Sequence, residues 1–224
     1  MIDAVLFDLD ETLLDRTASL RAFLADQFGR HAGSLGNVGM EQWREHFLAL
    51  DRRGQVLKTI VYPAILAEFG GEAGAYQTLF ADYASRCSAF AVPFDAMLST
   101  LIAIRSMGLP IAIVTNGGTE FQTKSIEALD LHKLTDAIFI SEREGLRKPD
   151  PALFVRAAEQ LGVPPERCLF VGDNPVADVL GAAATGMRTA WFRGAQQWPR
   201  ELPPNPGATI DRLDEVLGLL AGVR

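Results

Sequence analysis

The chain has 224 residues, which is enough for one large domain or for a core domain that carries a smaller one. Apolar residues make up 48% of the chain, so a packed core is expected and disorder is not. The formal net charge is −7 and Lys and Arg do not cluster, which argues against nucleic acid and against an anionic membrane as partners.

The location of the protein is predicted from the same composition. The first residues carry no basic segment and the longest apolar stretches are interrupted by charges, so we expect neither a signal peptide nor a membrane-spanning helix. Cys87 and Cys168 lie far apart and do not indicate a disulfide framework. We therefore expect a cytoplasmic protein. The sequence does not indicate its oligomeric state.

The first predicted element is a buried strand at residues 4–7, followed by a long stretch without any convincing strand. From residue 16 to residue 90 the apolar residues follow helical spacing. They predict four helices, at residues 17–30, 40–50, 56–69 and 75–90. Additional core helices are the simpler interpretation, but an insertion at a single point of the chain favours a separate small helical domain.

After residue 90, strands and helices alternate along the chain. Apolar runs predict strands at residues 111–114, 137–140, 168–171 and 188–192, and helices are predicted at residues 95–107, 119–130, 150–161 and 175–185. The runs are continuous, as is typical of parallel strands covered on both faces. Thr119–Gln122 fits a capping box, and Asp150 followed by Pro151 fits a helix start.

This order of elements predicts an α/β fold. We expect a Rossmann-like parallel sheet core, formed by residues 1–15 and 91–224, and an inserted all-helical cap domain at residues 16–90.

Polar side chains follow the predicted strands at the points where these strands end. They are Asp8 and Asp10 after the first strand, Thr115 and Asn116 after the second, Lys148 in the loop after the third, and Asp173 after the fourth. The carboxyl ends of parallel strands share one edge of the sheet, so we expect these side chains to meet there.

A group of three carboxylates requires a compensating charge. Two carboxylates about 4 Å apart repel each other by about 4 kcal/mol at an effective dielectric constant of 20. Oxygen-only ligands suit Mg²⁺, and no pair of His or Cys has zinc spacing nearby. The sequence therefore predicts a magnesium site that includes Asp8, Asp10 and Asp173, with Lys148 neutralising further charge.

Four motifs give the chain a specific resemblance. Asp8-Leu9-Asp10-Glu11-Thr12 resembles motif I of the haloacid dehalogenase-like (HAD) hydrolase superfamily, Thr115-Asn116-Gly117 resembles motif II, Lys148-Pro149 resembles motif III, and the segment from Gly172 to Asp178 resembles motif IV. The motifs occur in order and span nearly the whole chain. The insertion after the first motif resembles the C1-type helical cap.

The resemblance implies a phosphatase that acts on a small phosphate ester. Asp8 would be the nucleophile and a metal ligand, and Asp10 would be the acid and base, with its carbonyl facing the metal. Thr115 and Asn116 would hold the phosphoryl group. Lys148 would pair with Asp8 and with phosphoryl oxygens. Asp173 would bind the metal, and Asp178 would support the site from behind these ligands.

Some positions are less well defined. Glu11 stands where many members of the family have Gly, so the geometry of the turn after Asp10 is open, and we expect the side chain to face solvent. In the cap, Arg16 near the hinge and Arg52 and Arg53 in a loop are candidates for contact with substrate, although a solvated charged surface is the simpler interpretation.

Three other functions fit parts of the pattern. A 2-haloacid dehalogenase would share the nucleophile and need no metal, but Asp10 argues against it because dehalogenation has no leaving alkoxide to protonate. A phosphosugar mutase would use the same residues and shield the intermediate from water. A noncatalytic phosphate-binding protein would gain nothing from a carboxylate nucleophile that faces an anion.

Overall fold

A computed structural model describes residues 1–194 and 196–221 of the chain, which form two compact units. One unit combines Met1–Leu14 with the chain from Pro93 onward, and we call it the core. The other unit is Asp15–Val92, and we call it the helical unit. The last three residues of the predicted core, 222–224, lie outside the described residues.

The core contains a six-stranded parallel sheet, which confirms the predicted α/β fold class. Its strand order is β3-β2-β1-β4-β5-β6. The strands are β1 (Ala4–Phe7), β2 (Ile111–Thr115), β3 (Ala137–Ile140), β4 (Cys168–Gly172), β5 (Arg188–Phe192) and β6 (Ala208–Ile210). Strands β1 to β5 coincide closely with the predicted apolar runs. Strand β6 was not predicted, because it is a short edge strand in which Ile210 alone is buried.

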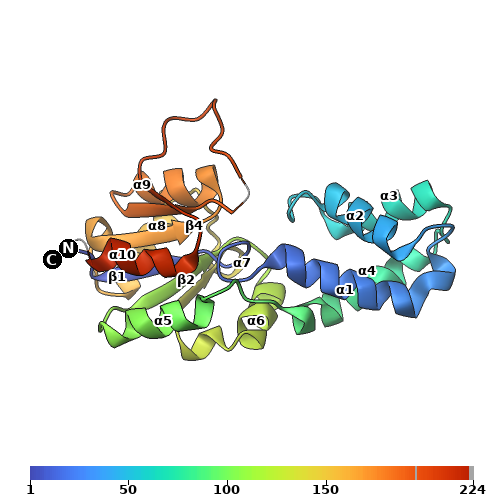
Figure 1. Ribbon diagram of the computed structural model, residues 1–224, viewed down its shortest axis with the longest axis horizontal. Coiled ribbons are helices and arrows are strands. Elements are labelled where there is room, and N and C mark those ends of the chain that lie inside the picture. Colours follow the sequence, from blue (N-terminus) through green and yellow to red (C-terminus); the bar gives the residue numbers. More distant parts are fainter. Residues whose placement is uncertain (195, 222–224) are drawn as a thin grey trace. The chain divides into compact units, whose positions relative to one another are not determined.

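Helices cover both faces of this sheet (Figure 1). They are α5 (Met97–Ser106), α6 (Thr119–Ala128), α7 (Ser141–Glu144), α8 (Pro151–Gln160), α9 (Gly181–Ala183) and α10 (Val216–Ala221), and the π-helical turn η5 (Pro175–Leu180) precedes α9. Leu153 and Phe154 of α8 pack with Leu6 and Phe170 of the sheet in one buried cluster. Within the described part of the chain, no helix is both long and apolar enough to cross a membrane.

Two predicted helix starts have different outcomes. The start at residue 150 is confirmed, because Asp150 accepts a hydrogen bond from Ala152 N at 2.9 Å and Pro151 is the first helical residue. The predicted capping box at residue 119 is wrong. The N-cap of α6 is Gly118, and the Glu142 carboxylate accepts from Thr119 N at 2.7 Å. The side chain of Gln122 is therefore not needed for the cap.

The helical unit is a small bundle with its own core. It consists of α1 (Arg16–His31), α2 (Met40–Asp51), α3 (Lys58–Phe69), α4 (Ala75–Arg86) and a short 3₁₀ turn, Cys87–Phe90. Trp43, Phe47 and Tyr62 are fully buried, and the rings of Phe47 and Tyr62 meet edge to face at 5.0 Å. These contacts explain why the aromatic residues of this segment follow helical spacing.

The helical unit begins and ends at one place. Asp15 N donates to Val92 O at 2.8 Å, which joins its first and last residues. On the core side of the two connections, Leu14 forms an antiparallel bridge with Pro93. The chain thus leaves the core and returns to it through two adjacent segments.

Candidate active site

The carboxyl ends of three neighbouring strands bring the predicted site residues together. Strand β1 lies between β2 and β4, with Phe7 paired to Ile113 on one side and to Val171 on the other. Asp8 follows β1, and its N–H donates to Val171 O at 2.9 Å. Thr115 ends β2 in the same region. The edge predicted from the order of strands is therefore present.

Lys148 forms the centre of the charged group. Its Nζ atom lies 2.6 Å from Asp8 Oδ1 and 2.7 Å from Asp178 Oδ1. All three side chains are buried, with 9% or less of each exposed. Burial opposes the charge of Lys148, but Asp178 and Asp8 outweigh it and raise the pKa of the ammonium group. One ammonium group thus faces two carboxylates, and the trio carries net negative charge when all three are ionised.

Asp173 adds a third carboxylate to this place. Carboxylate oxygens of Asp8, Asp173 and Asp178 all lie within 4.8 Å of one another. Burial, together with the negative charges of Asp178 and Asp10, raises the pKa of Asp8 to about 7 despite the opposing effect of Lys148. Ionised Asp8 therefore calls for a further cation in addition to Lys148.

Asp178 is held on both sides. One oxygen faces Lys148, and the other accepts from Asn174 N at 2.9 Å. Gly172 makes room for it, because a Cβ atom at position 172 would lie 2.5 Å from Asp178 Cγ. Asn174 caps the η5 turn by accepting from Val176 N at 3.0 Å. Asp178 therefore fixes Lys148 and the loop after β4 in one arrangement.

Asn116 connects the end of β2 to the loop that carries Lys148. Its Nδ2 donates to Lys148 O at 3.0 Å, and its Oδ1 accepts from Lys148 N at 2.9 Å. The side-chain amide of Asn116 is therefore occupied at both ends, and the predicted hold of Asn116 on the phosphoryl group stays a prediction that would use its backbone N–H. The Asn116 amide thus pairs with the backbone N–H and C=O of one residue, as a neighbouring strand would do in a β-sheet.

Among the buried oxygen atoms that lack a hydrogen-bond partner within the described residues are Thr115 Oγ1 and Asp10 Oδ1 of the candidate site. A buried polar atom without a partner is costly unless a ligand or water satisfies it. The other oxygen of Asp10 is held, because Gln122 Nε2 donates to Asp10 Oδ2 at 2.8 Å. Gln122 did not emerge from the sequence as a site residue, because its position suggested a helix cap.

Trp191 was also missed in the sequence. Its indole Nε1 donates to Asp173 O at 2.8 Å, which holds the backbone of the loop after β4. The residue pairs with Gly172 across β4 and β5, next to the end of both strands. That position is the signal that could have revealed it, since the ends of neighbouring strands share an edge.

Glu11 has a left-handed backbone conformation, with φ of 60°. A Cβ atom makes this conformation costly by about 1–2 kcal/mol, and Gly avoids the cost. This explains why Gly is common at the position. The Glu11 side chain is half-buried, in contrast to the predicted exposure to solvent.

A pair of substitutions tests this cost. We expect Glu11→Gly to be more stable than Glu11→Ala by about 1 kcal/mol, because both lack the carboxylate and the Ala variant alone keeps the Cβ atom. The measurement is the free energy of unfolding in urea. Equal stability of the two variants would show that the turn relaxes without strain.

The three arginines proposed for substrate contact lie in the helical unit. Arg16 Nη1 donates to Asp51 Oδ2 at 2.8 Å, and Lys58 also donates to Asp51. Two cations thus share one fully buried carboxylate inside the bundle. Arg52 and Arg53 are exposed and have left-handed backbone conformations, with φ of 47° and 57°.

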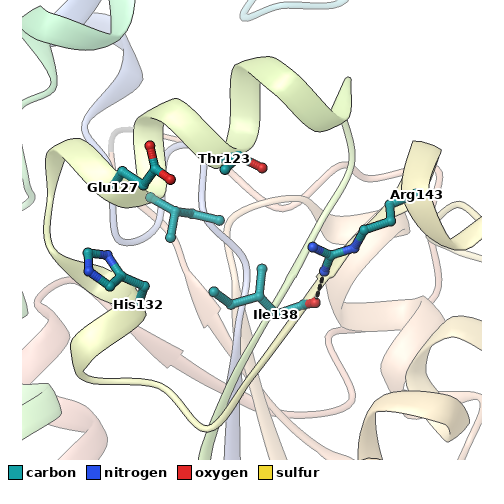
Figure 2. Close-up of a pocket in the computed structure, with 6 residues that line it drawn as sticks. Thr123, Glu127, His132, Ile138 and Arg143 are labelled. Carbon is teal, nitrogen blue, oxygen red and sulfur yellow. Dashed lines mark hydrogen bonds between the residues drawn. The ribbon is translucent and has the colours of Figure 1, made fainter.

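A surface pocket of about 500 Å³ lies elsewhere on the core, between α6 and β3 (Figure 2). Its lining includes Glu127, His132 and Arg143 and none of the predicted site residues. The Arg143 guanidinium donates to Ile138 O. The pocket therefore contributes nothing to the carboxylate group after β1.

Comparison with known proteins places these features in a family. The model of the haloacid dehalogenase-like hydrolases matches residues 2–186. The chain is 30% identical to glyceraldehyde 3-phosphate phosphatase of Methanopyrus kandleri, over 98% of this chain and 97% of that protein. The chain therefore belongs to the haloacid dehalogenase-like hydrolases. Within that family it is assigned to the phosphatases.

Two solved structures share the fold over nearly the whole chain. The HAD-hydrolase YfnB of Bacillus subtilis, solved with bound magnesium, is 26% identical with a TM-score of 0.77, over 98% of each chain. The 2-haloacid dehalogenase of Pseudomonas syringae pv. tomato DC3000 is 27% identical with a TM-score of 0.64, over 100% of each chain. The same fold thus occurs in a magnesium-bound hydrolase and in a dehalogenase, so the fold alone does not decide between their reactions.

Proposed function

We propose that the protein is a Mg²⁺-dependent phosphatase that hydrolyses small phosphate monoesters through an aspartyl-phosphate on Asp8. The observation that carries this proposal is the placement of Asp8. Asp8 is buried just after β1, and its Oδ1 lies 2.6 Å from Lys148 Nζ. Carboxylate oxygens of Asp8, Asp173 and Asp178 lie within 4.8 Å of one another. The Asp8 carboxylate can thus act as a nucleophile toward phosphorus, and the Lys148 ammonium group beside it supplies positive charge.

The donor set suits magnesium. Hard oxygen ligands suit Mg²⁺, and the three carboxylates supply only oxygen. Both oxygens of Asp178 are engaged with Lys148 and Asn174, so we propose the carboxylates of Asp8 and Asp173, with the carbonyl of Asp10, as the protein ligands. When bound, the ion would supply positive charge that offsets the repulsion between the nucleophile and an anionic phosphoryl group.

In the first step, a carboxylate oxygen of Asp8 attacks phosphorus and the bond between phosphorus and the ester oxygen breaks. Asp10 gives its proton to the leaving oxygen, so an alcohol departs and Asp10 becomes a carboxylate. Thr115 Oγ1 and Lys148 Nζ would donate to phosphoryl oxygens. The Asn116 side chain holds the Lys148 backbone, and its own backbone N–H would make the contact with the phosphoryl group.

In the second step, the Asp10 carboxylate accepts a proton from water as the water oxygen attacks phosphorus. The bond between phosphorus and the Asp8 oxygen breaks, which releases inorganic phosphate and restores both carboxyl groups to their starting states. Splitting one displacement in this way makes each half easier, and it gives Asp10 two opposite roles in sequence.

The test is phosphate release from a panel of sugar phosphates, phosphoglycolate-like acids, nucleoside monophosphates and one aryl phosphate, with Mg²⁺ and with EDTA. We expect release from at least one ester with Mg²⁺ and loss of at least about 100-fold in EDTA, because the ion supplies charge stabilisation worth several kcal/mol. If Mg²⁺-loaded protein releases no phosphate from any ester, the proposal is wrong.

Dehalogenation is the second candidate, favoured by the structural likeness to the Pseudomonas syringae enzyme. A haloacid substrate would also be attacked by Asp8, but halide needs no proton when it leaves. The half-buried Asp10 and the neighbouring carboxylates would then have no role in the reaction. Release of halide from a 2-haloacid in EDTA would support this candidate over the phosphatase.

The helical unit is proposed as the cap of this site. Substrate contact by Arg16, Arg52 and Arg53 remains a prediction, and Asp51 accepts from the Arg16 guanidinium twice.

A further inference from the structure

Gln122 lies inside the candidate site although no motif contains it. Its side chain is 2% exposed and comes from α6, one turn after the helix start. The Nε2 atom donates to Asp10 Oδ2 at 2.8 Å and approaches Asn116 O at 3.3 Å. The buried Gln122 amide therefore donates to a carboxylate and a carbonyl outside its own helix, and these contacts fix its position.

The backbone makes room for this amide. At Gly117 a Cβ atom would lie 2.6 Å from Gln122 Nε2 and 2.9 Å from its Cγ. The helix start does not require the Gln122 side chain, because Glu142 accepts from Thr119 N. The contact between Gln122 and Asp10 joins α6 to the loop after β1 across more than 100 positions of sequence.

The hydrogen bond distinguishes the two oxygens of Asp10. An amide N–H can donate only, so Oδ2 meets it with a lone pair and carries no proton on that side. The other oxygen, Oδ1, is buried and lacks a hydrogen-bond partner among the described residues. Oδ1 is thus the atom of Asp10 left to hold a proton and to pass it to a ligand.

We propose that Gln122 is a positioning residue, which holds Asp10 through Oδ2 so that Oδ1 carries out the proton transfers. The proposal rests on the phosphatase function above. Gln122 need not touch the substrate. A general acid contributes about 10²–10⁴-fold when it is well placed, and misplacement by about 1 Å can cost about 100-fold.

The experiment compares two esters whose leaving groups differ in their need for a proton. A primary alkyl phosphate leaves as a strongly basic alkoxide, whereas p-nitrophenyl phosphate leaves as a weakly basic phenolate. For Gln122→Met, which keeps the volume and removes the donor, we expect kcat/KM for the alkyl ester to fall by about 10–100-fold and for the aryl ester by less than about 3-fold. Binding of inorganic phosphate should be unchanged.

The aryl ester gives a second signature. Loss of the positioned base slows the attack of water on the aspartyl-phosphate, so Gln122→Met should release p-nitrophenolate in a burst before a slower steady state. Ser125→Ala is the matched control, because Ser125 is also buried on α6 but donates to Phe121 O at 3.1 Å instead of to Asp10. It should show neither the changed selectivity nor the burst.

If Gln122→Met is unstable, a double-variant cycle tests the proposed role of Gln122 instead. In an Asp10→Asn background, Gln122→Asn should cause no further loss of steady-state kcat with the aryl ester, whereas it should lower the same kcat when Asp10 is intact. An equal loss with both esters, or additive losses in the cycle, would overturn the proposal. Wild-type protein inactive on both esters would instead refute the phosphatase function itself, which is a separate result.

Discussion

Asp8→Asn should lower the rate of phosphate release by about 10⁴-fold or more, because an amide oxygen is too weak a nucleophile to displace the ester oxygen from phosphorus. The shape of the side chain is retained, and Lys148 keeps its contact with Asp178 at 2.7 Å, so the variant should fold. The measurement is phosphate release with Mg²⁺ at saturating substrate, alongside circular dichroism to confirm the fold.

An independent observation of the intermediate strengthens this test. Wild-type protein quenched in acid during a single turnover should carry one additional phosphoryl group on the peptide that contains Asp8, detected by mass spectrometry, and Asp8→Asn should carry none. Undiminished turnover by Asp8→Asn would refute the covalent route and would leave direct attack by water as the remaining mechanism.

Lys148→Met should destabilise the metal-free protein by about 3–5 kcal/mol above pH 8, because it leaves two buried carboxylates without their cation. Burial already raises the pKa of Asp8 to about 7 with Lys148 present. Carboxylates with raised folded-state pKa values destabilise the fold when ionised, and they cease to do so as the pH falls toward the unfolded value near 4. The loss of stability should therefore shrink as the pH is lowered through 7.

Asp178→Asn in the Lys148→Met background provides the control. The double variant removes one carboxylate and keeps a similar shape, so we expect it to recover at least half of the lost free energy of unfolding, measured in urea with EDTA. If the single variant is as stable as the wild type at pH 8, the buried ion pairs contribute little to the fold. Both variants should release phosphate slowly, because each lacks the ammonium group beside Asp8.

The parts of the fold that could be predicted are those governed by local chemistry. Strands β1, β2 and β4 are buried along their whole length, and β3 and β5 along part of it. Asp8, Thr115 and Asp173 could be brought together from the sequence because each follows one of the predicted apolar runs. That inference needs only the rule that parallel strands end at one edge. Both the order of elements and the acidic group at the edge follow from it.

The parts that could not be predicted depend on contacts between distant segments. Gln122 satisfies a local pattern for a helix cap, yet its amide reaches Asp10 because Glu142 already accepts from the helix start. Asn116 lies in a motif associated with phosphate, but it pairs with the backbone of Lys148. In each case the residue type allows several partners, and only the folded chain decides between them.

The two ends of the helical unit are adjacent, which affects how readily this segment can be replaced. Asp15 and Val92 are joined by a hydrogen bond, and Leu14 and Pro93 continue the pairing into the core. The two ends of the inserted segment therefore lie side by side, whatever that segment contains. Insertions of other lengths could replace it at little cost to the core, since the entropy of closing a loop grows slowly with its length. With the helical unit as the proposed cap, substrate preference would change by exchange of this whole segment, while the chemistry at the strand ends stays the same.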